Sequence, residues 1–208
     1  MDYMDRKKAY YNVKTPEELM IFMDKYIRYG IYGTDNKVYE NYGTSVDSEF
    51  QLACQNRYAL CDIERYLRYG YGTCWDQVEL QRDWFARNNY EFKTIFIWFL
   101  FEEENNYITH AYLVYKDKID NKYCYFEHAD YNNRGIYKFD TYKEAIEYQK
   151  VKHIKFNESC GNSIDDEVLN HLAIYEFDTP DFGCDMNGYI NHIIKSKVIY
   201  ENNKYINI

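Results

Sequence analysis

The chain has 208 residues, of which 46% are hydrophobic, so it is long enough to bury one sizeable core. Its net charge of −9, without a basic stripe, argues against nucleic-acid binding through phosphate neutralisation. No apolar run approaches the length of a membrane span, and residues 1–8 lack the apolar core of a signal peptide. The sequence therefore predicts neither a nucleic-acid nor a membrane partner, and a cytoplasmic location.

Six cysteines are spread along the chain, and no two have the C-x-x-C spacing of a metal or redox motif. A cytosolic chain keeps its thiols reduced, so most of them are expected to be small buried side chains. A set of metal ligands could be formed by His153, Cys160, His171, Cys184 and His192, but the spacing of these residues matches no zinc pattern. We expect no metal and no cofactor, and the sequence indicates no oligomeric state.

The N-terminal half has helical patterns. Residues 1–14 are polar and are expected to be loosely held, and Thr15-Pro16-Glu17-Glu18 is a strong helix start. That helix should end by Gly30 and be followed by a loop over 30–46 with a short strand near Val38. A second helix is expected over 47–69, and a third from Cys74 to about Asn88. Residues 28–34 resemble 68–73, which we interpret as a coincidence at two helix exits.

After residue 91 the period changes to that of strands. Strands are expected over 92–101, 108–115, 123–128 and 135–139, with a hairpin loop at 116–122. A short helix should run from Thr141 to about Gln149, and the rest is mixed: helix at 163–171, strand at 172–177, loop at 180–188 and an untyped element at 189–198. Helices followed by an antiparallel sheet predict an α+β fold. We expect an N-terminal helix and loop (1–46), a core (47–150) and a C-terminal extension (151–208) that packs on the same domain.

A glycine-rich turn leads directly into Cys74. Thr73 suits the N-cap of the helix, and Asp76 lies three residues further on, as in a capping box. Cys74 would then be the first helical residue, where unpaired N–H groups and the helix dipole favour the thiolate, which is the nucleophilic form. A nucleophilic cysteine needs a base, and the base needs an orienting group.

His110, near the start of a predicted strand, is the best candidate for the base, because imidazole can take a thiol proton near neutral pH. In a symmetric hairpin it lies opposite residue 127 or 128, depending on the register. In one register Glu127 lies beside His110. In the other register His128 lies there, and Asp130 could approach His110 from the loop after the strand. We favour Glu127 over Asp130 as the orienting carboxylate.

Three segments carry a resemblance to a known family: 72–79 with Cys74-Trp75, 109–115 with Thr109-His110, and 126–130 with Glu127. Over residues 50–140 their order resembles the transglutaminase-like superfamily, and most closely its small bacterial and phage-type members. The resemblance implies a papain-like core with a Cys-His-acid triad formed by Cys74, His110 and Glu127 or Asp130. Family members usually have Asp before a proline where this chain has Glu127, and they place an indole upstream of the cysteine where this chain has no Trp.

The resemblance implies thiol-dependent acyl transfer on a peptide or protein amide: peptide or isopeptide hydrolysis, deamidation or transglutamination. We favour hydrolysis, because no accessory region for presenting two protein substrates is recognised. The Cys74 N–H can serve as one oxyanion donor, and the second could come from Gln51, Gln55, Asn56 or a tyrosine. An arylamine N-acetyltransferase would share the core, but its Cys-Phe-Glu and Val-Asp-x-Gly-Phe-Gly segments are not found. The alternative from another class is a non-catalytic interaction module with the same fold.

Overall fold

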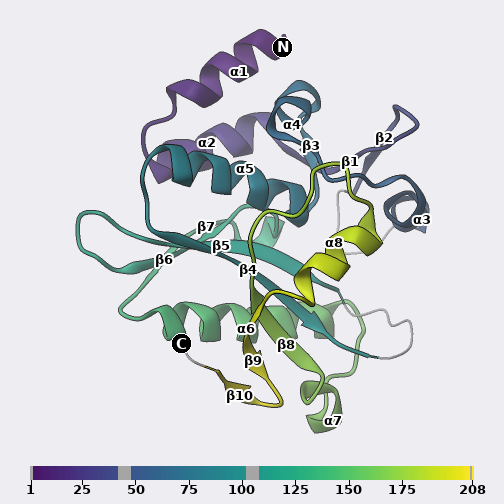
Figure 1. Cartoon of the computed structure of the whole chain (residues 1–208), viewed down its shortest axis with the longest axis vertical. Coiled ribbons are helices and arrows are strands. Elements are labelled where there is room, and N and C mark those ends of the chain that lie inside the picture. Colours follow the sequence, from purple (N-terminus) through teal and green to yellow (C-terminus); the bar gives the residue numbers. More distant parts are fainter. Residues whose placement is uncertain (1, 42–47, 102–107, 207) are drawn as a thin grey trace.

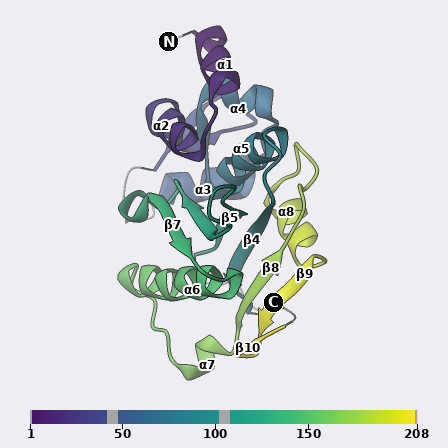
Figure 2. The same ribbon diagram turned by 90° about the vertical axis from the view of Figure 1, so that its left-hand side faces the viewer.

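The computed structural model describes residues 2–41, 48–101, 108–206 and 208, so residues 42–46 of the predicted loop lie outside the described part. The prediction of an α+β fold is confirmed: helices dominate before residue 91, and strands dominate after it. Figures 1 and 2 show the two faces of the central sheet covered by different helices, with α5 (Cys74–Arg87) on one side and α6 (Tyr142–Ser159) on the other.

Within the described residues, seven strands form one antiparallel sheet in the order β10-β9-β8-β4-β5-β6-β7. Their bounds are Phe92–Phe99 (β4), His110–Lys116 (β5), Tyr123–Glu127 (β6), Gly135–Phe139 (β7), Leu172–Glu176 (β8), Lys197–Glu201 (β9) and Lys204–Tyr205 (β10). β8 pairs directly with β4, so the C-terminal residues complete the sheet. The expected boundary after residue 150 falls inside α6.

The remaining helices lie mainly toward the α5 side. Helices α1, α2 and α4 lie around α5, and α7 lies beyond α6 (Figure 1). The bounds of the remaining helices are Tyr3–Asn12 (α1), Pro16–Tyr26 (α2), Ser48–Arg57 (α3), Ile63–Tyr69 (α4), Asp166–Leu169 (α7) and Met186–Ile193 (α8). Side chains alternate across the strands: Leu113 and Phe126 join the core beneath α5, whereas Val114 and Tyr125 join the core above α6.

A smaller sheet with the order β2-β1-β3 lies beside the α5 layer. It consists of β1 (Arg28–Tyr32), β2 (Val38–Glu40) and β3 (Tyr71–Gly72). β1 and β3 run parallel, with Tyr29 opposite Gly72. The two similar sequence segments, 28–34 and 68–73, therefore contribute neighbouring strands, and β3 leads directly into the start of α5.

Several boundaries differ from the sequence prediction for identifiable reasons. Residues 3–12 form α1 because Tyr10 is buried and its hydroxyl donates to Leu80 O (3.0 Å) and Asp83 Oδ2 (2.6 Å). The expected helix over 47–69 is divided into α3 and α4, since the backbone of Cys61 donates to Asp76 Oδ1 (3.1 Å) instead of continuing the helix. α6 continues to Ser159 rather than ending near Gln149.

Candidate functional site

The start of α5 is tightly constrained. Gly72 has no space for a side chain, since a Cβ there would lie 2.2 Å from the ring of Tyr66 and 2.7 Å from Cβ of Asp76. The Asp76 carboxylate accepts from the Thr73 N–H (2.9 Å) and from its hydroxyl (3.1 Å), which completes the predicted capping box. Cys74 is therefore the first residue of the helix, and it is 5% exposed.

The capping carboxylate itself titrates in an unusual range. Burial raises the pKa of Asp76 from 3.8 to about 6, although hydrogen bonds from the Cys61 N–H, Thr73 and Tyr58 oppose that rise. The charge at the start of α5 is thus sensitive to pH just below neutrality.

His110 and Glu127 meet at one end of the sheet, because His110 opens β5 and Glu127 closes its antiparallel neighbour β6. His110 Nε2 lies 2.7 Å from Glu127 Oε2, and the carboxylate is 2% exposed. The Tyr125 hydroxyl donates to the same oxygen, and the Asp130 N–H donates to Oε1 (2.8 Å). Both oxygens of the buried carboxylate are therefore satisfied, and the imidazole is held in one orientation.

The two pKa values move in opposite directions. Burial alone would lower the pKa of His110, but the Glu127 carboxylate and hydrogen bonds to Cys74 and Glu127 raise it well above its usual range. Burial alone would raise the pKa of Glu127, but His110, Tyr125 and the Asp130 N–H lower it. The pair is therefore ionised near neutrality, and Cys74 contacts the imidazole whose Nε2 is bonded to Glu127. The structure brings Cys74, His110 and Glu127 together in that order.

The strand register differs from both registers that the sequence suggested. Leu113 lies opposite Phe126 and Val114 opposite Tyr125, and continuing that pairing sets residue 110 opposite residue 129. Neither residue 127 nor residue 128 is thus directly across from His110, because the hairpin is shifted relative to the symmetric arrangement. Side chains still alternate, so Glu127 shares the His110 face from a diagonal position.

His128 and Asp130, the residues of the other register, have separate contacts. His128 is fully buried on the opposite face of the sheet, with Nδ1 2.7 Å from the side-chain oxygen of Gln77 in α5. The Asp130 carboxylate caps a 3-10 turn, η1 (Tyr131–Asn133), by accepting from Asn132 N (3.1 Å) and Asn133 Nδ2 (2.7 Å). Asp130 reaches Glu127 through its backbone N–H and not through its carboxylate.

Further residues around the site were not identified from the sequence. The Trp75 indole N–H donates to Thr109 Oγ1 (3.3 Å), which links the start of α5 to the residue before His110. Asn157 of α6 is fully buried and accepts from the Ile108 N–H (2.8 Å). No sequence signal pointed to Asn157, since the helix was expected to end before it.

Tyr29 is the missed residue closest to the chemistry. Both the side chain and the backbone of Cys74 lie close enough to the Tyr29 hydroxyl to shift its pKa. The amides considered as oxyanion donors, Gln51, Gln55 and Asn56, are exposed on α3, and Asn56 Nδ2 donates within its own helix to Leu52 O (2.9 Å).

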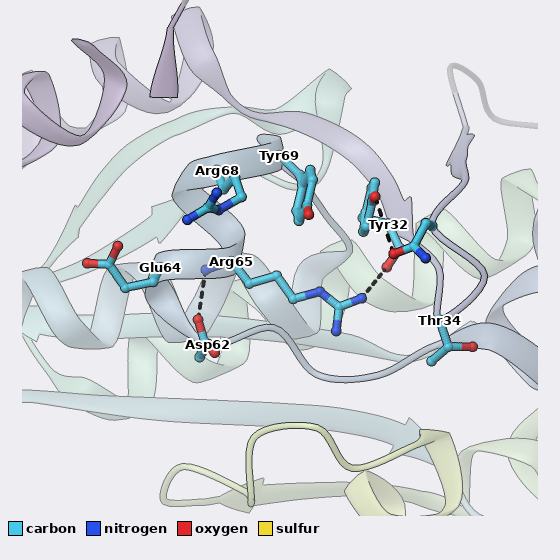
Figure 3. Close-up of a pocket in the computed structure, with 8 residues that line it drawn as sticks. Tyr32, Thr34, Asp62, Glu64, Arg65, Arg68 and Tyr69 are labelled. Carbon is cyan, nitrogen blue, oxygen red and sulfur yellow. Dashed lines mark hydrogen bonds between the residues drawn. The ribbon is translucent and has the colours of Figure 1, made fainter. Parts of the chain in front are cut away.

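A separate hollow of about 470 Å³ lies between α4 and the turn after β1 (Figure 3). The rings of Tyr32 and Tyr69 stack at 3.6 Å on one side of it, and Arg65 donates to Tyr32 O (3.0 Å) across it. Cys74, His110, Glu127 and Asp130 are not among the described residues that line it. This hollow is therefore distinct from the Cys-His-Glu site.

No family model matches the chain, and the comparisons with curated proteins and with solved structures found no match. Among the described residues, no helix is long and apolar enough to cross a membrane. In the same part of the chain, no group of three or more His, Cys, Asp and Glu side chains is arranged to hold a metal ion. The function therefore has to be inferred from the geometry of the site.

Proposed function

We propose that this chain catalyses thiol-dependent acyl transfer at a peptide or protein amide, on a papain-like core of the transglutaminase-like type. Cys74 is the nucleophile, His110 the general acid and base, and Glu127 the orienting carboxylate. The observation that carries the proposal is the His110–Glu127 hydrogen bond of 2.7 Å, on an imidazole that also contacts a cysteine at a helix start.

The reaction follows from these positions. The Cys74 sulfur attacks the amide carbonyl carbon as a thiolate, with its proton already held on the His110 imidazolium. The C–N bond breaks as His110 returns the proton to the departing amine, leaving an acyl thioester on Cys74. Water, or a second amine, then attacks the thioester and gives a proton to His110, and the sulfur leaves. Glu127 fixes the imidazole tautomer and stabilises the imidazolium without taking the proton.

One observation favours a second function, that of a non-catalytic interaction module with the same fold. Cys74 is 5% exposed, and a substrate carbonyl must reach its sulfur. A binding module needs no access to the sulfur, so the limited exposure of Cys74 is no obstacle to that function.

Labelling with iodoacetamide separates the two functions. Catalysis predicts that Cys74 reacts faster than the other five cysteines, and that His110→Ala slows labelling of Cys74 while leaving labelling of Cys160 unchanged. Cys160 is a suitable internal reference because it is partly exposed and lies at the end of α6. Equal, slow labelling of all six cysteines, or a Cys74 rate that ignores His110, would contradict the catalytic proposal.

A further inference from the structure

Tyr29 is positioned beside the nucleophile by the small sheet. It lies on β1 directly opposite Gly72 of β3, and Gly72 is two residues before Cys74. Its ring lies 6.1 Å from that of Phe50, and its carbonyl accepts from the Asn41 N–H (3.3 Å), so both the ring and the backbone of Tyr29 are held. The side chain and the backbone of Cys74 both shift the pKa of the Tyr29 hydroxyl, so the hydroxyl lies beside the start of α5.

That position is where acyl transfer needs a hydrogen-bond donor. When a thiolate attacks a carbonyl, the oxygen becomes negatively charged and must be stabilised by fixed donors. The Cys74 N–H is one such donor, because the first N–H groups of a helix have no partner within the helix. A carbonyl oxygen that approaches this N–H also comes within reach of the Tyr29 O–H.

We propose that Tyr29 is the second oxyanion donor of the site, an inference that rests on the proposed acyl transfer. As the Sγ–C bond forms, the carbonyl π electrons move onto oxygen, which accepts from the Cys74 N–H and the Tyr29 O–H. As the C=O bond re-forms, the leaving group departs with the electrons of its bond, and the Tyr29 proton remains on Tyr29 throughout.

The ionisation of Tyr29 agrees with this role. Burial raises its pKa well above 10, and the neighbouring Cys74 and Cys54 raise it further. The phenol therefore stays protonated across the neutral range and keeps its O–H to donate.

Two reactions of the same sulfur test the proposal. Acylation by p-nitrophenyl acetate passes through an oxyanion, whereas alkylation by iodoacetamide displaces iodide at a CH2 group and forms none. Tyr29→Phe is expected to slow acylation of Cys74 about 10²-fold more than it slows alkylation, because loss of the hydroxyl beside the sulfur affects both reactions, whereas loss of the oxyanion donor affects only acylation. Tyr32→Phe is the matched control, because Tyr32 lies on the same strand and stacks on Tyr69, away from Cys74. It should change neither rate, and Cys74→Ser measures the background from the other cysteines.

The outcomes separate the two proposals. Unchanged acylation in Tyr29→Phe, or an equal loss in both reactions, overturns the role of Tyr29 but leaves the acyl-transfer proposal standing. Absence of any Cys74-dependent acylation in the wild type overturns the proposed function and, with it, the role of Tyr29.

Discussion

Replacing Glu127 by Gln tests the central pair of the site. The carboxylate accepts from three donors: His110 Nε2 (2.7 Å), the Asp130 N–H (2.8 Å) and the Tyr125 hydroxyl. A glutamine has one acceptor oxygen, so in either orientation its NH2 group faces at least one of these buried donors. Leaving a buried donor unpaired costs about 1–3 kcal/mol. Glu127→Ala also leaves the buried imidazolium without a counter-charge and should cost about 3–5 kcal/mol.

The cost should depend on pH with a definite sign. The pKa of His110 is raised above 6.5, so its stabilising contribution is complete below that value and is lost as the pH rises through the folded-state pKa. The pKa of Glu127 is lowered below 4.5, so its contribution is present above that value and is lost as the pH falls through the folded-state pKa. The free energy of unfolding of the wild type should therefore exceed that of Glu127→Gln most between these two ordinary values.

Urea unfolding at several pH values, with an NMR titration of the His110 ring, measures both effects. We expect the pKa of His110 to fall in Glu127→Gln and the alkylation of Cys74 to slow. Asp130→Asn is the matched control: it keeps the backbone N–H to Glu127 and alters only the cap of η1, so it should cost about 1 kcal/mol or less. The reasoning is refuted if Asp130→Asn is as damaging as Glu127→Gln, or if the ring titrates identically in Glu127→Gln and the wild type.

Two further predictions concern the supports of the site. Asn157→Leu leaves the Ile108 N–H unpaired and should lower the free energy of unfolding by about 1–3 kcal/mol; an unchanged value in urea unfolding would contradict this. Burial raises the pKa of Asp76 from 3.8 to about 6. The contribution of Asp76 to the free energy of unfolding is therefore complete below pH 3.8, and about 3 kcal/mol is lost as the pH rises through 6. The free energy of unfolding of Asp76→Asn should lack that decline, and an identical pH dependence in variant and wild type would show that Asp76 does not titrate there.

Local signals predicted much of the fold. Thr15-Pro16 and Thr73-Cys74 mark the starts of α2 and α5, where a side-chain cap lies within three residues of the group it binds. β6 was predicted to within one residue, because alternation is a property of consecutive residues. The division of 47–69 into α3 and α4 could not be predicted in this way, since it depends on the carboxylate of Asp76, which is remote in sequence from Cys61.

In the candidate site, too, the features set by nearby residues could be predicted, and those set by distant residues could not. Cys74, His110 and Glu127 could be chosen as candidates because helix starts, strand starts and strand ends have local patterns. The register of β5 and β6 could not be predicted, since a hairpin shifted from the symmetric pairing has the same alternation of side chains. Tyr29 was missed because its position depends on the parallel pairing of β1 with β3, whose residues are far apart in the chain.

The position of His110 at the end of a strand explains how the site can form at all. Its neighbour two residues on, Tyr112, belongs to the core above α6, so alternation assigns His110 to that face, whereas Cys74 belongs to the core beneath α5. In the middle of a strand the sheet would separate the two side chains. At the first residue of the strand, the imidazole can extend past the end of the sheet to the Cys74 sulfur. The two preceding residues are held from both layers: Asn157 of α6 bonds to Ile108, and Trp75 of α5 bonds to Thr109. Loosening either layer should therefore change the reactivity of Cys74, although neither Asn157 nor Thr109 contributes a reacting atom.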